Sequence, residues 1–288
     1  MTTAQLGDSG ITIGETDSFG CRWGWSGDSP DPWSPSPSPR DVTGENATTH
    51  GAWDATEFYG PRTFSLEGFV VAPSHEALHQ AKTRFWAACG LRPFELRIIE
   101  PGYDRFATMR RGGEPSWKEI SPESPARANF SVPLWGRDPR LYSTVLHTAS
   151  TRFPTTTGGL EVPLQVPFEL DAVATSGEMN LQNTGSEDAW PVYRIDPANS
   201  VPVVDPVIVE AATGRAMRFK LTINPGDWVT IDTRNHLVLG NGEPGASRRS
   251  SFYGDWLSLE PGASKTIRYA GASGDGSTLS AAWRMTDI

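Results

Sequence analysis

The residues with the clearest chemical meaning are His75-Glu76-Ala77-Leu78-His79. This is the spacing of a zinc metalloprotease helix, in which two histidines at i and i+4 share a face and bind Zn²⁺. The glutamate between them then acts as general base on a zinc-bound water. The pattern therefore raises the question of whether the surrounding chain can present such a site.

The element that carries this pattern is predicted to be a helix from Ser74 to Cys89. Ser74 is a good N-cap residue directly after Pro73, and Gly90 follows as the expected C-terminal stop. Apolar side chains recur with the 3.6-residue period of a helix and form one face: Ala77, Leu78, Ala81, Phe85, Ala88 and Cys89.

The helix places the two histidines badly for zinc. At about 100° per residue, the apolar stripe points away from His75 and His79, and Lys82 shares their side with a charge that opposes Zn²⁺. Lys82 and Phe85 also stand where the extended motif has Gly and His. A downstream acidic pair, Glu100 and Asp104, is separated by a Pro-Gly that breaks the helix it would need. We expect a solvent-facing amphipathic helix without metal.

Other patterns for catalysis are weak. We find no nucleophile elbow, no phosphate-binding loop and no dinucleotide-binding glycine motif. Asp227, Asp232 and Asp255 could act as the paired carboxylates of a glycosidase, but acids of this kind are common in the turns of β-proteins. We therefore expect turn residues here, and no catalytic, cofactor-binding or metal-binding residue; the protein is not expected to be an enzyme.

The tryptophans allow two interpretations. Trp190, Trp228, Trp256 and Trp283 could form a platform on which sugars stack, which would make the chain a carbohydrate-binding module. All four fall at strand-like positions, where burial in a core is the commoner fate of an aromatic side chain. We expect core positions, with carbohydrate binding as the alternative.

The bulk composition favours β-structure. The chain has 288 residues with 29 Gly and 24 Pro, which disfavours long helices, and 11 Trp. A net charge of −9 argues against a nucleic-acid-binding surface, though it is compatible with a pore through which DNA slides. Cys21 and Cys89 are too few for a disulfide framework and are expected to be buried. We see no signal peptide and no membrane span, and expect folding in a cytoplasm.

The first half is predicted to hold several strands and one unusual loop. Five prolines fall within residues 30–39, which favours an exposed, extended segment. It could contact a neighbouring subunit or, less in keeping with the rest of the chain, act as a proline-rich peptide ligand. The predicted strands are Ile11–Ile13, Cys21–Trp25, Phe64–Ala72, Phe94–Glu100, Tyr103–Arg110 and Ala128–Trp135.

The chain changes character near residue 143. Thr and Ser accumulate from Thr148 to Thr157, which suggests an exposed connection, and Gly158-Gly159 opens a second all-β region. We place the domains at 1–143 and 144–288. The last third consists of short alternating segments separated by turn sequences: Asn183-Thr184-Gly185, Thr213-Gly214-Arg215 and Pro225-Gly226-Asp227.

These segments resemble a known family. The order Asn-x-Gly, Pro, strand, Gly-Asp-x-x-x-Ile-Asp-Thr, here Asn183–Gly185, Pro191 and Gly226–Thr233, is similar to the C-terminal domain of phage distal tail proteins. Three earlier stretches match the same family in the same order: Gly60-Pro61-Arg62 through Gly68 followed by the helix, Asp138–Ser143, and Gly158–Pro163 with Pro167-Phe168.

The resemblance implies both a fold and a role. Residues 1–143 would form a β-sandwich or split barrel with one helix, like tail-tube proteins, and residues 144–288 a galectin-like antiparallel β-sandwich. Six copies would form a ring at the distal end of a long non-contractile tail, joining the tail tube to the tip and baseplate proteins. The tape measure protein would be a further partner. Genomic DNA would pass through the lumen without specific binding, and assembly would take place in the host cytoplasm. The alternative is a carbohydrate-binding receptor-recognition module of the tail tip.

Overall fold

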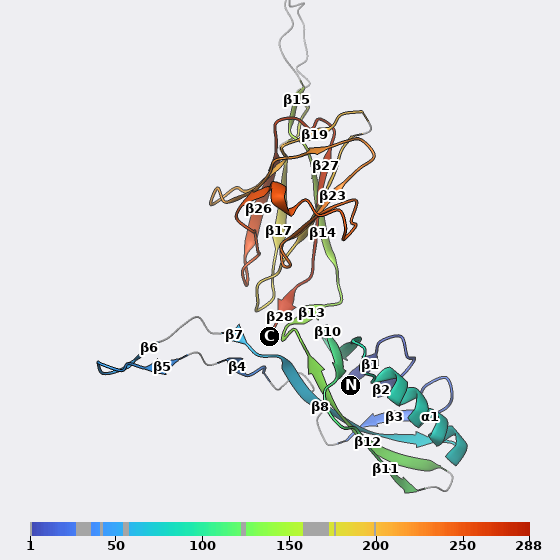
Figure 1. The fold of residues 1–288 in the computed structure, drawn as a ribbon. Helices are drawn as coiled ribbons and strands as arrows, with labels where there is room; N and C mark the ends of the chain where they lie inside the picture. The colour runs from blue at the N-terminus through green and yellow to red at the C-terminus, as the bar shows by residue number, and fades with distance from the viewer. Residues whose placement is uncertain are drawn as a thin grey trace, which may run out of the picture. The chain divides into compact units, whose positions relative to one another are not determined.

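The structure is a computed structural model that describes residues 2–26, 36–40, 43–53, 58–121, 125–157, 173–175, 177–198 and 200–288 (Figure 1). The described chain is mainly β, with antiparallel sheets and one α-helix, so the predicted fold class is confirmed. It forms two compact units. Unit 1 comprises Met1–Thr144 with Asp287–Ile288, and unit 2 comprises Val145–Thr286. The assignment of these parts to functional domains at 1–143 and 144–288 stays a prediction.

Unit 1 is built on a ten-stranded sheet whose main path runs β2-β1-β9-β10-β12-β8-β3. Two backbone hydrogen bonds, from Gly14 N to Trp23 O (3.1 Å) and from Trp23 N to Glu15 O (2.9 Å), bring the two ends of this path together. Strand β11 lies beside β12, and β13 lies beside β10 and β28. The strands are β1 (Thr3–Leu6), β2 (Thr12–Ile13), β3 (Arg22–Trp25), β8 (Arg62–Ala72), β9 (Phe94–Glu100), β10 (Tyr103–Arg111), β11 (Ser116–Ser121), β12 (Ala126–Gly136), β13 (Leu141–Ser143) and β28 (Thr286–Asp287).

Helix α1 (His75–Ala88) forms where the sequence predicts it. The Ser74 hydroxyl accepts a hydrogen bond from Ala77 N (3.2 Å), which confirms the N-cap. Leu78, Ala81 and Phe85 are buried, and the helix packs across β8 and β12 (Figure 1). The helix ends at Ala88 although the glycine after Cys89 does not adopt the left-handed conformation of a glycine cap.

The core of unit 1 is rich in aromatic rings. Phe85 from the helix lies 4.4 Å from Phe130 and 5.4 Å from Trp23, measured between ring centroids. Trp117 from β11 and Trp86 complete the cluster at its edge. Both cysteines are free and buried, as expected. No helix in the described part of the chain has the length and apolar character that a membrane crossing requires.

Unit 2 consists of two five-stranded antiparallel sheets that share one core. The first has the order β14 (His147–Arg152), β27 (Thr278–Trp283), β18 (Val192–Asp196), β23 (Val229–Asp232), β24 (Leu237–Gly240). The second has the order β17 (Glu178–Gln182), β26 (Ser264–Ala270), β20 (Val207–Glu210), β21 (Ala216–Phe219), β25 (Phe252–Gly254). Minor elements are β15 (Thr155–Thr157) with β16 (Val173–Thr175), β19 (Val203–Val204) with β22 (Thr222–Ile223), and the 3-10 turn Arg249–Ser251.

Two stretches expected to be exposed are the Thr/Ser-rich segment from Thr148 and the proline-rich segment. The Thr/Ser-rich stretch from Thr148 is not an exposed connection, because β14 pairs with β27 over six residues, from His147 opposite Trp283 to Arg152 opposite Thr278. Threonine suits an edge strand well, since its branched side chain packs on a pleated surface. Most of the proline-rich stretch, residues 27–35, lies outside the described residues, as do Gly158–Pro163 and Pro167-Phe168.

Candidate assembly surfaces

The zinc-like pattern lies on the solvent side of helix α1. His75, Glu76 and His79 are all exposed, while the buried residues of the helix point away from the two histidines, as predicted. Within the residues that the structure describes, no group of three or more His, Cys, Asp or Glu side chains could hold a metal ion. The expectation of no bound metal stays a prediction.

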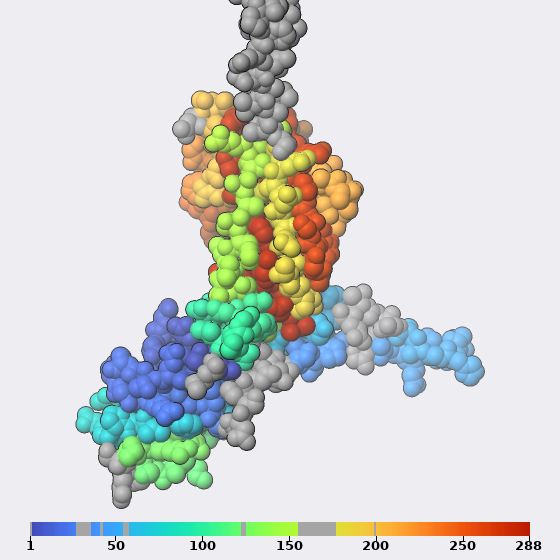
Figure 2. All heavy atoms as spheres, turned by 180° about the vertical axis from the view of Figure 1, so that it is seen from behind, coloured from blue at the N-terminus to red at the C-terminus, as the bar shows by residue number. Residues whose placement is uncertain are grey.

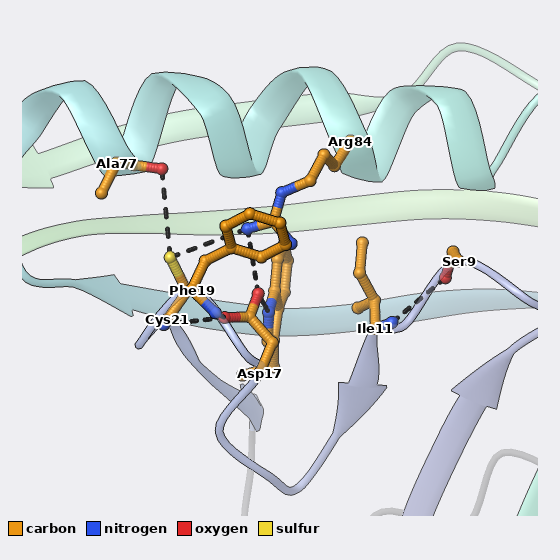
Figure 3. Close-up of polar contacts among 8 residues, drawn as sticks. Ser9, Ile11, Asp17, Phe19, Cys21, Ala77 and Arg84 are labelled. Carbon is orange, nitrogen blue, oxygen red and sulfur yellow. Dashed lines mark hydrogen bonds and ion pairs between the residues drawn. The ribbon is translucent and has the colours of Figure 1, made fainter.

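A buried carboxylate holds the helix in place (Figure 3). The side chain of Asp17, in the turn between β2 and β3, has no exposed surface. Its Oδ1 accepts hydrogen bonds from Phe19 N and Cys21 N, both at 2.9 Å, and its Oδ2 accepts one from Trp23 Nε1 at 3.0 Å. Arg84 of the helix places Nη2 3.0 Å from the same Oδ2. The turn is thus tied to the middle of helix α1.

The charge of Asp17 is stabilised by these contacts. Burial alone would raise the pKa of Asp17, but the hydrogen bonds from Trp23, Cys21, Phe19 and Arg84 outweigh it and hold the pKa below its ordinary value. The Phe19 ring covers the Arg84 guanidinium at 4.0 Å, so this cation lies between an aromatic face and a carboxylate (Figure 3). Sequence analysis did not single out Asp17 or Arg84, because neither belongs to a local motif.

Two stretches that carry the family resemblance meet in space. Arg62, at the start of β8, is only 1% exposed, and its Nε donates to Pro139 O at 2.8 Å. Tyr142 OH donates to Asp138 Oδ2 at 2.5 Å in the same segment. Gly60-Pro61-Arg62 and Asp138-Pro139-Arg140 therefore lie together. The buried Arg62 side chain holds the segment at Pro139, close to the end of unit 1.

One side of the unit 1 sheet is not covered by the helix. We call it the outer face. We define it by side chains of β3, β8, β11 and β12 that point away from α1, together with Arg110 of β10, which lies opposite Trp135. They are Arg22, Glu67, Phe69, Val71, Arg110, Lys118, Arg127, Asn129, Ser131 and Trp135.

The outer face combines aromatic rings with arginines. Phe69 lies over Gly24, where a Cβ would stand 2.3 Å from the ring, so any other residue there would displace the ring. The guanidinium of Arg127 lies 4.9 Å from the Phe69 ring centroid, and that of Arg110 lies 4.2 Å from the Trp135 ring centroid. A groove of about 280 Å³ opens beside Trp135, between β8, Gly112 and Pro133. The face thus offers apolar surface under a positive rim.

A second exposed feature of unit 1 is a narrow β-ribbon that we call the arm, made of the described residues 36–40, 43–53 and 58–60. Pro39–Arg40 (β4) pairs with Phe58–Tyr59 (β7), and Gly44–Glu45 (β5) pairs with Ala52–Trp53 (β6). In Figures 1 and 2 the described part of the arm stands out from the rest of unit 1, with β5 and β6 at its far end.

The arm exposes large aromatic side chains. Trp53 is 51% exposed, Phe58 58% and Tyr59 43%. A two-stranded ribbon is marginally stable by itself in water, and clustered exposed aromatics are typical of protein interfaces. The arm is therefore a second candidate assembly surface, distinct from the outer face.

The tryptophans of unit 2 correct one prediction. Trp283 is buried, at 6% exposed, and its Nε1 donates to Gln182 O at 2.8 Å. Trp190, Trp228 and Trp256 are only partly buried, so the expectation of core positions is wrong for these three. The Trp256 ring stacks with Phe252 at 4.1 Å and with His236 at 4.7 Å between centroids, and the Arg194 guanidinium lies 4.5 Å from the Trp228 ring centroid.

Two of the acids expected in turns lie beside one: Asp227 directly follows the Pro225-Gly226 turn, and Asp232 ends β23 before the next turn, whereas Asp255 follows β25 outside a turn. Asp227 Oδ1 accepts a hydrogen bond from Asn241 Nδ2 at 3.0 Å. Asp232 Oδ1 accepts from Arg234 N at 3.0 Å and Asn235 N at 2.9 Å in the turn after β23. These carboxylates satisfy turn donors and do not face one another across a cleft. Asp255 is exposed and lies 3.9 Å from the Arg215 guanidinium.

The Asn-x-Gly motif has a structural explanation. Asn183 is fully buried, and its Nδ2 donates to Glu187 O at 2.7 Å and Leu259 O at 2.9 Å. Its Oδ1 accepts from Gly185 N at 3.0 Å. A Cβ at Gly185 would lie 2.1 Å from Thr286 O, so only glycine fits. The motif therefore closes one end of the sandwich.

Comparison with known proteins gives a consistent result. Residues 184–284 match the family model described as siphovirus-type tail component, C-terminal domain. The crystal structure of the Dit protein of phage SPP1 superposes with a TM-score of 0.52 at 14% identity, covering 88% of this chain and 90% of that chain. The resemblance to phage distal tail proteins is confirmed.

Further structures share the fold. The phage P2 baseplate in its activated conformation with Ca contains a chain that matches with a TM-score of 0.53 at 9% identity, covering 98% of both chains. The same baseplate with Sr gives a TM-score of 0.50 at 9% identity, covering 98% of this chain and 97% of that chain. No curated protein matches the sequence. At these identities the structural matches establish the fold.

Proposed function

We propose that this protein is a structural component of the distal end of a long, non-contractile phage tail. The observation that carries the proposal is the match of residues 184–284 to the siphovirus-type tail component domain. The fold likeness to SPP1 Dit, whose title describes a hub adsorption apparatus, and to a chain of the P2 baseplate supports it over nearly the whole chain. These likenesses are to tail and baseplate components and do not favour a carbohydrate-binding module.

Six copies form a ring that connects the tail tube to the tip or baseplate proteins. The two candidate surfaces of unit 1 support this arrangement, because two different exposed surfaces on one subunit allow a head-to-tail contact between copies. Contacts of that kind close into rings when the rotation between neighbours divides a full turn. Within the assembly the ring contacts the tube protein above, the hub proteins below and the tape measure protein, and it carries out no catalysis.

The ring is placed in the virion, with genomic DNA passing through its lumen without specific binding. The net charge of −9 supports this, since a surface that repels phosphate lets DNA slide. Subunits would fold and assemble in the host cytoplasm before joining the tail.

The proposal is tested on purified full-length protein and on virions. Native mass spectrometry at high protein concentration is expected to show a hexamer, and electron micrographs a ring. An antibody against the chain is expected to label one end of isolated tails. A strict monomer at every concentration, together with no label on tails, would refute the proposal.

A further inference from the structure

We propose that a stack of rings on the surface of unit 2 is a docking site for an acidic polypeptide segment of another tail protein. The stack consists of His236, Trp256 and Phe252 with Arg249 beside them, and we call it the basic stack. The inference rests on the proposed function and concerns unit 2 alone, whereas the arm and the outer face belong to unit 1.

The basic stack runs from the surface of unit 2 into its core. The His236 and Trp256 rings lie within 11° of parallel with centroids 4.7 Å apart, and the Trp256 and Phe252 rings lie within 16° at 4.1 Å. Phe252 in turn lies 5.5 Å from Phe219, which is 1% exposed, while His236 is exposed. Because the core fixes these rings, a partner that binds here removes little side-chain freedom.

His236 has a backbone conformation that is uncommon for its residue type. Its φ is +56°, in the left-handed region that few non-glycine residues adopt. A glycine would adopt this conformation without cost, but it would leave one face of Trp256 without the ring that covers it. Uncommon backbone conformations of this kind cluster at functional sites.

Arg249 lies at the side of the stack with its charge available. Its guanidinium carbon is 4.8 Å from the Phe252 centroid and 5.2 Å from the Trp256 centroid. These two centroids are themselves 4.1 Å apart, so the guanidinium lies to one side of the line that joins them. Arg249 is exposed, and no carboxylate among the described residues forms an ion pair with it.

The charge around the basic stack is positive, in a chain of net charge −9. Arg215 Nη2 donates to Trp256 O at 3.4 Å, and Arg215 Nε lies 3.9 Å from Asp255, which makes a long ion pair. The carboxylate of Asp232, in the turn that carries His236, is already occupied by hydrogen bonds from residues of that turn. The complementary partner carries Asp and Glu side chains, since opposite charges speed the encounter and fix its register.

The stack does not suit a sugar or a nucleic-acid base. Two rings as close and as parallel to Trp256 as His236 and Phe252 cannot share one of its faces without overlapping, so they cover both faces. A sugar or a base that stacks needs a free ring face. Carboxylates need none, because ring edges carry the positive part of the aromatic quadrupole and Arg249 lies beside them. Trp and Arg are also the residues that most often carry binding energy in protein interfaces.

The first test uses isolated tails in which the photo-cross-linking residue benzoylphenylalanine replaces Leu237. Leu237 follows His236 in the chain and is 42% exposed. We expect a cross-link to a segment of another tail protein that has an excess of Asp and Glu. Adding Arg249→Glu should abolish this cross-link. Adding Arg152→Glu should not, because Arg152 is exposed on β14, at the edge of the sheet opposite β24.

The outcomes of the first test separate this inference from the proposed function. Tails that carry the protein, as shown by the antibody, but give no cross-link to another protein would overturn the inference alone. A cross-link to a segment without an acidic excess would do the same. Tails that lack the protein would refute the proposed function as well.

The second test uses purified full-length protein and does not depend on tail assembly. A fluorescein-labelled poly-glutamate peptide is the probe, and its binding is followed by fluorescence anisotropy. We expect binding that weakens with added salt and that Arg249→Glu reduces about tenfold or more, since reversal of an interfacial charge replaces attraction with repulsion. His236→Gly should reduce binding by a smaller factor, because it removes the outer ring and leaves the arginine charge. Arg152→Glu should change binding little.

The controls of the second test make its failure unambiguous. Circular dichroism confirms that each variant is folded. Absence of poly-glutamate binding by the wild type, or equal binding by the wild type and Arg249→Glu, would overturn the inference. A single-stranded oligodeoxynucleotide of equal charge is the competing probe. Tighter binding of the oligonucleotide than of the peptide, lost in Arg249→Glu, would assign the basic stack to nucleic acid and overturn the inference.

Discussion

The two units stabilise their sheets in different ways. In unit 1 a single helix covers one side of one sheet, and an aromatic cluster centred on Phe85, with Trp23 and Phe130, fills the space between them. In unit 2 two sheets cover each other, and the largely apolar core also contains buried polar groups. Unit 1 therefore depends on the docking of one element, whereas unit 2 depends on satisfying polar groups inside it.

Three charged side chains of unit 2 are connected through one buried lysine. Lys265 Nζ lies 3.2 Å from Glu210 Oε1 and 2.5 Å from Glu260 Oε2, and both Lys265 and Glu210 are less than a tenth exposed. Burial, with a smaller contribution from the Glu210 charge, raises the pKa of Tyr193 above its ordinary range. Tyr193 therefore stays neutral, and Lys265 is the cation that makes the Glu210 carboxylate tolerable at this depth.

The largest effect is expected from Phe85→Asp or Leu78→Asp. Either change buries an unpaired carboxylate under the helix of unit 1, at a cost of several kcal/mol that is comparable to the stability of a whole domain. Hydrogen exchange measured by peptide mass spectrometry should show unit 1 unprotected and unit 2 still protected. Thr83→Asp, on the exposed side of the same helix, is the matched control and should leave both units protected. Protection of unit 1 in the Phe85 variant would mean that the helix is not required to cover the sheet.

A smaller effect is expected from Lys265→Ala in unit 2. Removing one partner of a buried ion pair leaves Glu210 uncompensated, at a cost of about 3–5 kcal/mol. The loss should appear as a lower denaturant midpoint for unit 2 alone. Lys220→Ala removes an equally charged side chain that is 80% exposed, 3.8 Å from Asp205, and should change the midpoint little. Equal effects of the two substitutions would show that burial of the lysine does not matter.

The contrast between the units also shows what sequence reasoning can reach. Helix α1 and strands β8, β9 and β12 were predictable because long periodic apolar patterns and a Ser N-cap mark them. Strand β11 was not, since Ser116–Ser121 has no alternating pattern and is held by pairing with β12. The Thr/Ser-rich β14 resembles a connection in sequence for the same reason, although it pairs with β27. Such strands form because they pair with strands that are distant in the sequence, and a local pattern does not show this pairing.

Burial was the least predictable property. Trp190, Trp228 and Trp256 resemble core residues in sequence but lie partly exposed, while Arg62 resembles a surface residue and is 1% exposed. The outer face could not be predicted from the sequence either. A strand that is buried on one side shows the same alternation of apolar and polar residues whether or not a partner covers its other side. Asp17 and Arg84 illustrate the remaining limit, since only the fold brings them together.

A pH-dependent effect is expected from Asp17→Asn, which weakens the docking of the unit 1 helix without unfolding it. The folded-state pKa of Asp17 is held below its ordinary value near 4. Its contribution to stability is therefore fully present above pH 4 and is lost as the pH falls through the lower folded-state pKa. At pH 7 the variant should be less stable by about 2 kcal/mol, as expected for hydrogen bonds to a charged group.

The pH profile separates this role from simple packing. The stability difference between wild type and Asp17→Asn should shrink as the pH falls from 5 towards 2, measured by urea unfolding of unit 1. Asp8→Asn, which changes a carboxylate in a nearby surface turn, serves as the control and should give a profile parallel to that of the wild type. A difference that stays constant with pH would show that the charge of Asp17 does not contribute.

The smallest effect is expected from removing both histidines of the zinc-like pattern. His75 and His79 are exposed, lie away from the buried stripe of helix α1, and share their side of the helix with Lys82. His75→Ala with His79→Ala should therefore leave the melting temperature of unit 1 within a degree or two of the wild type, since surface substitutions usually change stability by less than about 0.5 kcal/mol. Metal analysis by plasma mass spectrometry should find no stoichiometric zinc in either protein. Zinc that is present in the wild type and lost in the double variant would contradict the prediction. It would place a metal site on the exposed side of helix α1. A large drop in melting temperature without zinc would instead mean that these side chains stabilise the helix. The packing of helix α1 on the sheet would then depend on its exposed side as well as on its buried side.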